Sequence, residues 1–319
     1  MIFAVNAMAY LVFLIGALIV GLHLWTRKLA QDALRAVPQA GRLHPVTGGA
    51  IHYVEMGPKD GQPLVLIHGL SAQLQHFTYG ITEHLSDTYR IIALDRPGSG
   101  YSRRDDDGMA ALDIQARMIW QMLDDLGVQH PVIAGHSLGG AVALAMALQR
   151  PDDTGALALI SPLTHGADGP ADVFKGLLVA SPTVRRLIGQ TIATPMAKLM
   201  TDKILTEAFS PEIYPPDFLD RAGAALGLRP EGYISASADI VASGRSIHTQ
   251  MTRYANELRA PGGVLYGAGD TVLSADREGR VMENYGLSYE ELPNRGHMIP
   301  ISAPADCADF IRRMAALVR

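Results

Sequence analysis

The chain has 319 residues, of which 48% are hydrophobic and 18% are charged, and this composition excludes a largely disordered protein. Its formal net charge of −5 gives no basic field for a phosphate backbone, so we expect no nucleic-acid partner. The single cysteine, Cys307, excludes an internal disulfide and a cysteine zinc cluster.

The segment 2–25 is the most apolar part of the chain and predicts a transmembrane anchor. Its 24 residues include no Asp, Glu, Lys or Arg, and as a helix they would extend about 36 Å, enough to cross a hydrocarbon core. A cleaved signal peptide is the alternative, although the basic start and the small-residue cleavage site are weak. Arg27 and Lys28 follow directly, so the positive-inside rule predicts that the rest of the chain lies in the cytoplasm and that the lipid bilayer is a partner.

The next part of the chain predicts a neck and then an α/β body. Residues 26–44 are expected to form a polar, partly helical neck, and the body is expected to begin near Pro45. Short apolar runs between glycines and prolines predict strands, and helical patterns alternate with them. Because these runs lack polar alternation, they indicate a doubly wound, mostly parallel sheet. The predicted strands cover 50–56, 64–67, 90–94, 131–134, 156–160 and 263–266, and the clearest helices cover 111–126 and 138–149.

Between residues 163 and 254 the strand rhythm stops, and prolines interrupt a helical pattern. Since sheet-like runs resume afterwards, this segment is predicted to be a helical cap inserted into a core made of 45–162 and 255–319. Several apolar, adaptable side chains in or near the cap could line an acyl pocket or could serve ordinary packing. They are Met196, Met200, Met251, Phe174, Phe209 and Phe218.

Ser137 is the candidate nucleophile. It lies in Gly135-His136-Ser137-Leu138-Gly139, where a predicted strand ends and a predicted helix begins. A nucleophile on so tight a turn has strained backbone angles, and its neighbours two residues away must be small. The turn would lift the Ser137 hydroxyl above the sheet, and the helix start would direct the Leu138 N–H at a developing oxyanion. A glycine-rich packing turn is the alternative interpretation.

A serine nucleophile needs a base and a carboxylate that orients it. His297 lies in a loop between a predicted last strand, 289–292, and a closing helix, 303–317, at the edge where open α/β sheets bind ligands. Asp270 ends the glycine-rich turn after a predicted strand, and Asp276 is the second choice. The order Ser137, Asp270, His297 is the one expected on this fold. Taken singly, the aspartate could be a turn cap and the histidine a surface residue.

The loop after residue 67 is expected to complete the site. Gly69 lets the backbone turn close to Ser137, so the Leu70 N–H is the predicted second oxyanion donor. His68 is expected to hold this loop in shape by hydrogen bonding. Ser71 and His136 are the predicted substrate-binding residues.

Two further segments have structural interpretations. Residues 95–102 read DRPGSGYS and predict a turn under the site. The acidic run Asp105-Asp106-Asp107 is expected to be solvated rather than to bind a metal. No zinc-protease, P-loop or dinucleotide-binding motif occurs in a fitting context, so we expect no metal and no cofactor.

Together these motifs resemble those of the α/β-hydrolase superfamily from Pro45 to the C-terminus. The resemblance is carried by HGLSA at 68–72, DRPGSGYS at 95–102, GHSLGG at 135–140, YGAGD at 266–270 and RGHMIP at 295–300. It implies Ser137 as nucleophile, His297 as general base, Asp270 as orienting acid, Leu70 and Leu138 as oxyanion donors, and a cap after Ile160. Serine at 137 argues against the haloalkane dehalogenase and epoxide hydrolase branches. An anchor ahead of such a domain is similar to the membrane-anchored monoacylglycerol lipases.

The expected activity is therefore hydrolysis of carboxylic esters, lipid-derived or with an apolar acyl group, through an acyl-enzyme. One alternative is a carbon–carbon bond hydrolase or an acyltransferase with the same triad. The other is a catalytically inactive, membrane-tethered binding protein. The sequence does not determine the oligomeric state.

Overall fold

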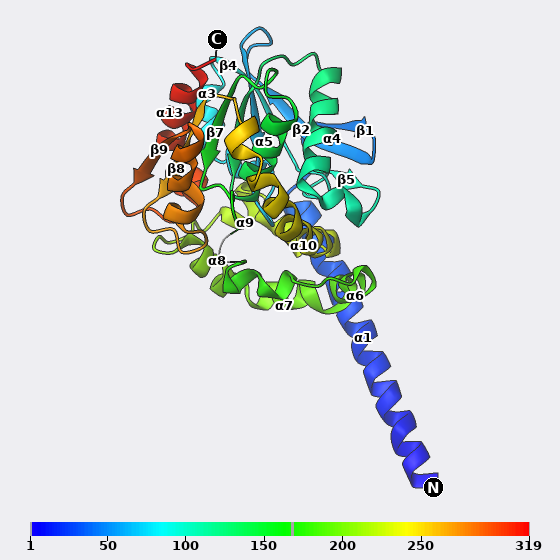
Figure 1. Cartoon of the computed structure of the whole chain (residues 1–319). Coiled ribbons are helices and arrows are strands. Elements are labelled where there is room, and N and C mark those ends of the chain that lie inside the picture. Colours follow the sequence, from blue (N-terminus) through cyan, green and yellow to red (C-terminus); the bar gives the residue numbers. More distant parts are fainter. Residues whose placement is uncertain (1, 167–168, 319) are drawn as a thin grey trace.

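The computed structural model describes residues 2–166 and 169–318 (Figure 1). One sheet forms the centre of the body. Its strands are β1 Arg42–Val46, β2 Gly49–Met56, β3 Gln62–Ile67, β4 Tyr89–Leu94, β5 Arg103–Arg104, β6 Val132–His136, β7 Ala156–Ile160, β8 Gly262–Gly267 and β9 Ser288–Leu292.

The strand order is β1-β2-β4-β3-β6-β7-β8-β9, with β5 paired to β2. All neighbours from β4 to β9 are parallel, whereas β2 is antiparallel to β1, β4 and β5. The predicted doubly wound, mostly parallel sheet is thus confirmed. Strands β6, β7 and β8 are buried along their whole length, as expected where helices cover both faces of a sheet.

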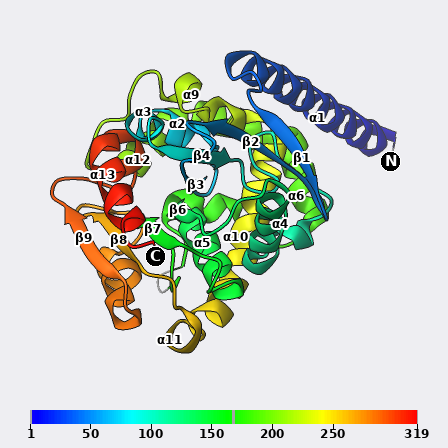
Figure 2. The same cartoon turned by 90° about the horizontal axis from the view of Figure 1, so that it is seen from above.

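Helices pack on both faces of this sheet (Figure 2). Helices α4 and α5 contact each other on one face, where α5 packs on β6, and α13 contacts α3 and β7 on the other. Helix α5 is apolar all round and almost fully buried, because it is enclosed by α4, the sheet and residues from the cap. The helices of these layers are α2 Gln75–Thr78, α3 Ile81–Leu85, η1 Asp107–Ala110, α4 Leu112–Asp125, α5 Leu138–Gln149, η5 Ala275–Gly279, η6 Arg280–Tyr285, α12 Ile299–Ser302 and α13 Pro304–Ala315.

The described residues between β7 and β8 form a set of helices that lies across one end of the sheet (Figure 1). That end holds the carboxyl ends of the parallel strands, since the cap leaves the sheet directly after β7. The helices are η2 Asp172–Leu177, α6 Pro182–Ile188, η3 Gly189–Ala193, α7 Thr194–Leu199, α8 Thr201–Phe209, α9 Phe218–Arg221, η4 Ala224–Leu228, α10 Pro230–Met251 and α11 Tyr254–Glu257.

The predicted neck differs from the structure at both of its ends. Helix α1, Ile2–Ala36, continues through the first part of the neck, where Ala33 and Val37 pack against Ala225 and Leu226 of the cap. Strand β1 already begins at Arg42, before the predicted start of the body at Pro45. Strand β1 could not be predicted from an apolar run, because it is an edge strand with mostly exposed side chains.

Helix α1 leaves the body as a single long rod (Figure 1). Its most apolar window is 0% buried, and its length and composition are sufficient to cross a membrane. A signal sequence near the N-terminus passes the same test. The C-terminal half of α1 is attached to the cap, because Thr26 Oγ1 donates to the Thr191 carbonyl at 2.9 Å and His23 Nδ1 lies 3.0 Å from the Gln190 carbonyl.

Candidate active site

Ser137 lies between β6 and α5 with φ 54° and ψ −120°. A positive φ at a non-glycine residue costs about 1–3 kcal/mol and persists only where surrounding contacts impose it. The Ser137 N–H donates to the Ile160 carbonyl at 3.0 Å. The Ser137 carbonyl accepts from Gly140 at 2.9 Å and from Leu163 at 3.0 Å. The strained turn is therefore fixed by β7 and by the first residues of the cap.

The two glycines beside this turn are required by close backbone approach. A Cβ atom at Gly135 would lie 2.4 Å from the Gly139 carbonyl oxygen, and one at Gly139 would lie 2.1 Å from the Ile67 carbonyl oxygen. Either would overlap with main-chain atoms. The glycines thus allow the start of α5 to pack against β3 and β6 directly beneath Ser137.

His297 and Asp270 form a hydrogen-bonded pair. His297 Nδ1 lies 2.7 Å from Asp270 Oδ2, and both side chains are almost completely buried. Asp270 Oδ1 accepts from the N–H groups of Val272 at 2.8 Å and Leu273 at 2.9 Å. These two bonds fix the carboxylate, which in turn sets the orientation of the imidazole. With Nδ1 donating to the carboxylate, Nε2 is the nitrogen that can accept a proton.

Ser137 and His297 line one cavity of about 250 Å³ beneath the cap. In the part of the chain that the structure describes, no hydrogen bond joins the Ser137 hydroxyl to the His297 imidazole. Such contacts are often long without substrate and tighten in the Michaelis complex. The structure therefore brings the three predicted triad residues to one place, as a formed His297–Asp270 pair and a serine in the same cavity.

The predicted oxyanion loop lies against Ser137. A Cβ atom at Gly69 would be 3.0 Å from Ser137 Cβ, so a larger residue would crowd Ser137. Leu70 lines the same cavity, and Leu138 is the first residue of α5. Among the described residues, neither of their N–H groups donates to a protein acceptor. Both remain available for a substrate oxygen.

His136, predicted to bind substrate, also contacts the loop that carries His297. It lines the cavity, its Nε2 donates to the His297 carbonyl at 3.1 Å, and the two rings lie 4.9 Å apart. Burial, together with the neighbouring His297, holds the pKa of His136 well below its usual range, so its ring is neutral. The structure therefore places His136 as a support for the His297 loop. Ser71 is exposed beside the cavity, in a left-handed conformation with φ 52°.

The turn 95–102 holds the predicted oxyanion loop through Arg96. The Arg96 N–H donates to His68 Nε2 at 2.9 Å, and its guanidinium donates to the carbonyls of His68 and Gly69 at 3.0 Å each. His68 Nδ1 also lies 2.8 Å from the Gly69 carbonyl, so His68 holds the loop as predicted. Burial and then the Arg96 charge keep the pKa of His68 well below its usual range.

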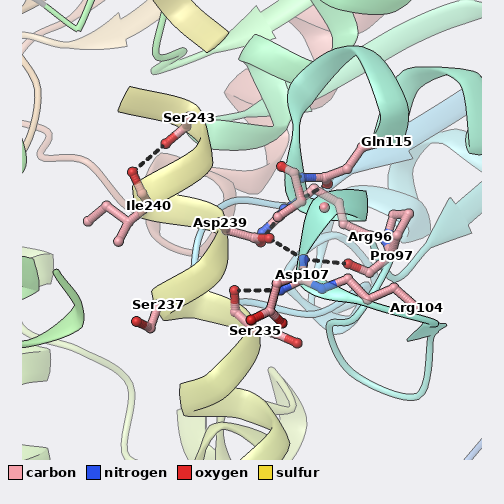
Figure 3. A network of polar contacts seen from close by, with 12 residues as sticks. Arg96, Pro97, Arg104, Asp107, Gln115, Ser235, Ser237, Asp239, Ile240 and Ser243 are labelled. Carbon is pink, nitrogen blue, oxygen red and sulfur yellow. Dashed lines mark hydrogen bonds and ion pairs between the residues drawn. The ribbon is translucent and has the colours of Figure 1, made fainter. Parts of the chain in front are cut away.

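Arg96 is itself fixed by the cap. Its Nη1 lies 2.7 Å from Asp239 Oδ2, and Arg104 lies 2.5 Å from Asp239 Oδ1 (Figure 3). Asp239 is on α10 and is completely buried with Arg96. Asp239 could not be predicted from local sequence, because its partners Arg96 and Arg104 are more than 130 residues away.

The acidic run 105–107 was predicted to be solvated, and for Asp107 this is wrong. Asp107 Oδ2 lies 2.5 Å from Arg185, which is buried, and 3.1 Å from Arg186, both on α6. Asp106 accepts from the Gly108 N–H and begins η1. Local sequence could not reveal the pair, because its other half lies in the cap.

Glu212 is a second cap residue that the sequence did not reveal. Its two carboxylate oxygens accept from Arg295 and from the Gly296 N–H, each at 2.8 Å. These residues directly precede His297. The cap thus holds the loop that carries the imidazole.

The apolar cap residues divide into two groups. Phe174, Phe209 and Phe218 line the cavity as predicted. Met196 and Met200 are exposed on the outside of the cap instead. Met251, predicted with them, packs against the core that contains α4 and α5.

Comparison with known proteins identifies the family. The sequence model described as the alpha/beta hydrolase family matches residues 64–310, so the chain belongs to this family. A dihydrolipoyllysine-residue acetyltransferase component of an acetoin cleaving system from Pseudomonas putida is 28% identical over 285 residues, which is 86% of this chain and 68% of the relative. A 2-hydroxy-6-oxononadienedioate/2-hydroxy-6-oxononatrienedioate hydrolase from Paraburkholderia phymatum is 25% identical and covers 71% of this chain and 76% of the relative.

Several other curated relatives match over less than half of their own length. Among solved structures, a putative lipase from Acinetobacter baumannii has a TM-score of 0.69 at 20% identity and covers 92% of this chain and 96% of that chain. At this identity the likeness shows the fold alone. The relatives include varied hydrolases and an acyltransferase component, so the reaction has to be argued from the site.

Proposed function

We propose that the protein is a serine hydrolase that cleaves carboxylic esters through an acyl-enzyme. The observation that carries this proposal is the hydrogen-bonded His297–Asp270 pair on the same cavity as Ser137, which is held at a strained strand-to-helix turn. Three distant segments would then supply a nucleophile, a base and an orienting acid, which are the groups that serine-dependent acyl transfer uses.

In the proposed reaction, His297 Nε2 removes the proton of Ser137 as its oxygen attacks the acyl carbonyl. The N–H groups of Leu70 and Leu138 stabilise the negative charge that develops on the carbonyl oxygen. Asp270 keeps the imidazole in the productive tautomer and stabilises its charged form. His297 then protonates the leaving alcohol, and a water activated by the same imidazole releases the acid.

The substrate that we propose has an apolar acyl group. Three phenylalanines and several leucines line the cavity, and such side chains bind hydrocarbon better than charged groups. We further propose that residues 2–25 anchor the chain in a bilayer. Arg27 and Lys28 would keep the catalytic body on the cytoplasmic side, where it meets lipid-derived esters.

A series of p-nitrophenyl and glycerol esters of increasing acyl length tests the activity on the purified full chain. We expect turnover that rises from acetate to longer acyl groups, and we expect the Ser137→Ala variant to lose it. Ser86→Ala, at the C-terminal end of α3 and outside the cavity, is the matched control and should keep full activity. Equal turnover by the wild type and by Ser137→Ala would refute the proposal.

Similarity to the Paraburkholderia hydrolase favours a second candidate, a carbon–carbon bond hydrolase with the same residues. The acetyltransferase relative favours transfer of the acyl group to an acceptor other than water. Product analysis by mass spectrometry separates these reactions, because ester hydrolysis yields one acid and one alcohol in equal amounts. A chain that hydrolyses no ester and reacts with no serine-directed probe would instead be a tethered binding protein.

A further inference from the structure

The outer face of the cap carries a stripe of exposed apolar side chains along the continuous segment α6–η3–α7. We call it the outer stripe, and its members are Val184, Leu187, Ile192, Met196 and Leu199. They are between 45% and 68% exposed. They follow one another at steps of three, five, four and three residues, and the long step falls in the π-helical turn η3. Because a π-turn holds one extra residue, the stripe stays on one face.

The opposite face of the same segment belongs to the catalytic cavity. Ala193, Thr194 and Ala197 line that cavity, and Arg185 and Gly189 are buried against the body. The segment is therefore a wall one helix thick, with the cavity on one side and the outer stripe on the other. A cap that met only water would carry polar residues on its outer face.

The attachment of α1 sets the depth of this stripe. His23 and Thr26 contact the carbonyls of Gln190 and Thr191, and Ile192 of the outer stripe comes next in the chain. On α1, these contacts fall where the apolar run 2–25 ends and Arg27 follows. Figure 1 shows α6 and α7 at the end of the body from which α1 departs. The end of the membrane span and the outer stripe thus lie at one level.

We propose that the outer stripe contacts the surface of the bilayer that α1 enters, so that the cap wall of the cavity rests on lipid. This inference depends on the membrane anchor of the proposed function. We choose a bilayer as the partner of the outer stripe because the stripe adjoins the apolar helix α1 at the level where this helix would leave the hydrocarbon core of the membrane. The exposed Lys198 and Lys203 lie in and beside the stripe, where basic side chains can reach lipid phosphates.

A thiol-linked environment-sensitive fluorophore measures this contact in the full chain. Cys307 is completely buried, so an engineered cysteine is the accessible thiol. Leu199→Cys reports on the outer stripe. Lys59→Cys, in the turn before β3 at the opposite end of the sheet, is the matched control. In vesicles of phosphatidylcholine and phosphatidylglycerol we expect blue-shifted emission and quenching by brominated lipid at 199, with neither change at 59.

Alkaline carbonate extraction of the same vesicles reports separately on the anchor. If the chain is retained in the vesicles but the probe at 199 emits as in water, the proposed contact of the outer stripe with the bilayer is refuted and the anchor is supported. A chain that is extracted would overturn both. Neither readout depends on ester turnover, so a failure of the esterase proposal is distinguishable from a failure of the bilayer contact.

The triple variant Leu187→Ser/Ile192→Ser/Leu199→Ser tests the consequence for catalysis. Its three side chains are exposed, so their loss should not unfold the cap. We expect about tenfold or more loss of turnover for an ester dissolved in vesicles and unchanged turnover for a short, water-soluble ester. Lys59→Ser/Asp60→Ser should change neither rate. Equal losses on both esters, or no loss on either, would contradict a membrane-resting cap.

Discussion

At the scale of single residues, the proposed mechanism depends most on Asp270. Its Oδ1 is held by two backbone N–H groups and its Oδ2 by His297, so it acts on the imidazole through a fixed geometry. An amide in its place would favour the wrong tautomer of His297.

We therefore expect Asp270→Asn to lower kcat by about 10⁴-fold with a folded chain. Asp276→Asn is the control, because Asp276 is exposed and pairs with Arg280. It should keep kcat within about twofold, since the carboxylate that pairs with His297 is that of Asp270. The check is steady-state hydrolysis of a short-chain ester. Similar kcat values for the two variants would remove Asp270 from the mechanism.

His76 makes stability depend on pH. Burial lowers the pKa of this histidine to about 4, whereas an unfolded histidine has a pKa of about 6.5. Between these values the unfolded chain binds the extra proton, so stability falls as the pH falls below about 6.5. Lowering the pH from 7 to 5 should cost about 2 kcal/mol through this group.

His68 and His136 act in the same direction, because burial lowers both of their pKa values. His76→Gln cannot take up a proton and should flatten the dependence, which urea unfolding at pH 7 and pH 5 measures. His84→Gln, in an exposed position on α3, is the matched control and should retain the wild-type slope. An unchanged slope in His76→Gln would show that His76 does not stay neutral when folded.

Ser137, Asp270 and His297 could be predicted from the sequence, because each follows a predicted strand and lies in a turn with a recognisable motif. Asp239 and Glu212 could not be predicted. Both lie in the cap and act on segments far away in the chain, and each has the local pattern of an ordinary polar residue. The contact of His136 with His297 could not be predicted either, since only the fold brings the two rings together.

At the scale of elements, α10 is tied to the oxyanion loop by a buried ion pair. Asp239 on α10 holds Arg96, and Arg96 holds the carbonyls of His68 and Gly69. Removal of the carboxylate leaves two buried guanidinium groups, Arg96 and Arg104, without their counter-charge.

We expect Asp239→Asn to destabilise the chain by about 3–5 kcal/mol, as for other broken buried pairs. Asp113→Asn breaks an exposed pair with Arg117 on α4 and should cost less than about 1 kcal/mol. Chemical denaturation measured by far-UV circular dichroism gives both values. If Asp239→Asn cost no more than Asp113→Asn, the pair would not be what joins cap and core.

The sequence predicted the central strands well, because uninterrupted apolar runs between turn residues leave few alternatives. Where the bounds moved, they moved by one or two residues, as for β6 and α13, since helix and strand ends depend on hydrogen bonds with distant segments. Strand β1 was missed for a different reason. An edge strand buries few side chains, so pairing with β2 identifies it and apolar content does not.

At the scale of the whole molecule, the cap lies across one end of the sheet, and α1 departs from the same end (Figure 1). The cavity lies beneath this cap. If residues 2–25 span a bilayer, expressed full chain should sediment with membranes and resist alkaline carbonate. Mass spectrometry of its N-terminus should find these residues intact. A soluble chain that starts after residue 25 would show that α1 is a cleaved signal sequence.

In the proposed mechanism, His297 activates the Ser137 hydroxyl to attack acyl and phosphoryl centres. Incubation of the folded full chain with a fluorophosphonate, followed by intact-mass and peptide mass spectrometry, tests it directly. The account predicts one adduct per chain, on Ser137, which His297→Ala reduces strongly and Ser86→Ala does not change. An unlabelled wild-type chain, or an adduct on another residue that persists in Ser137→Ala, would contradict it.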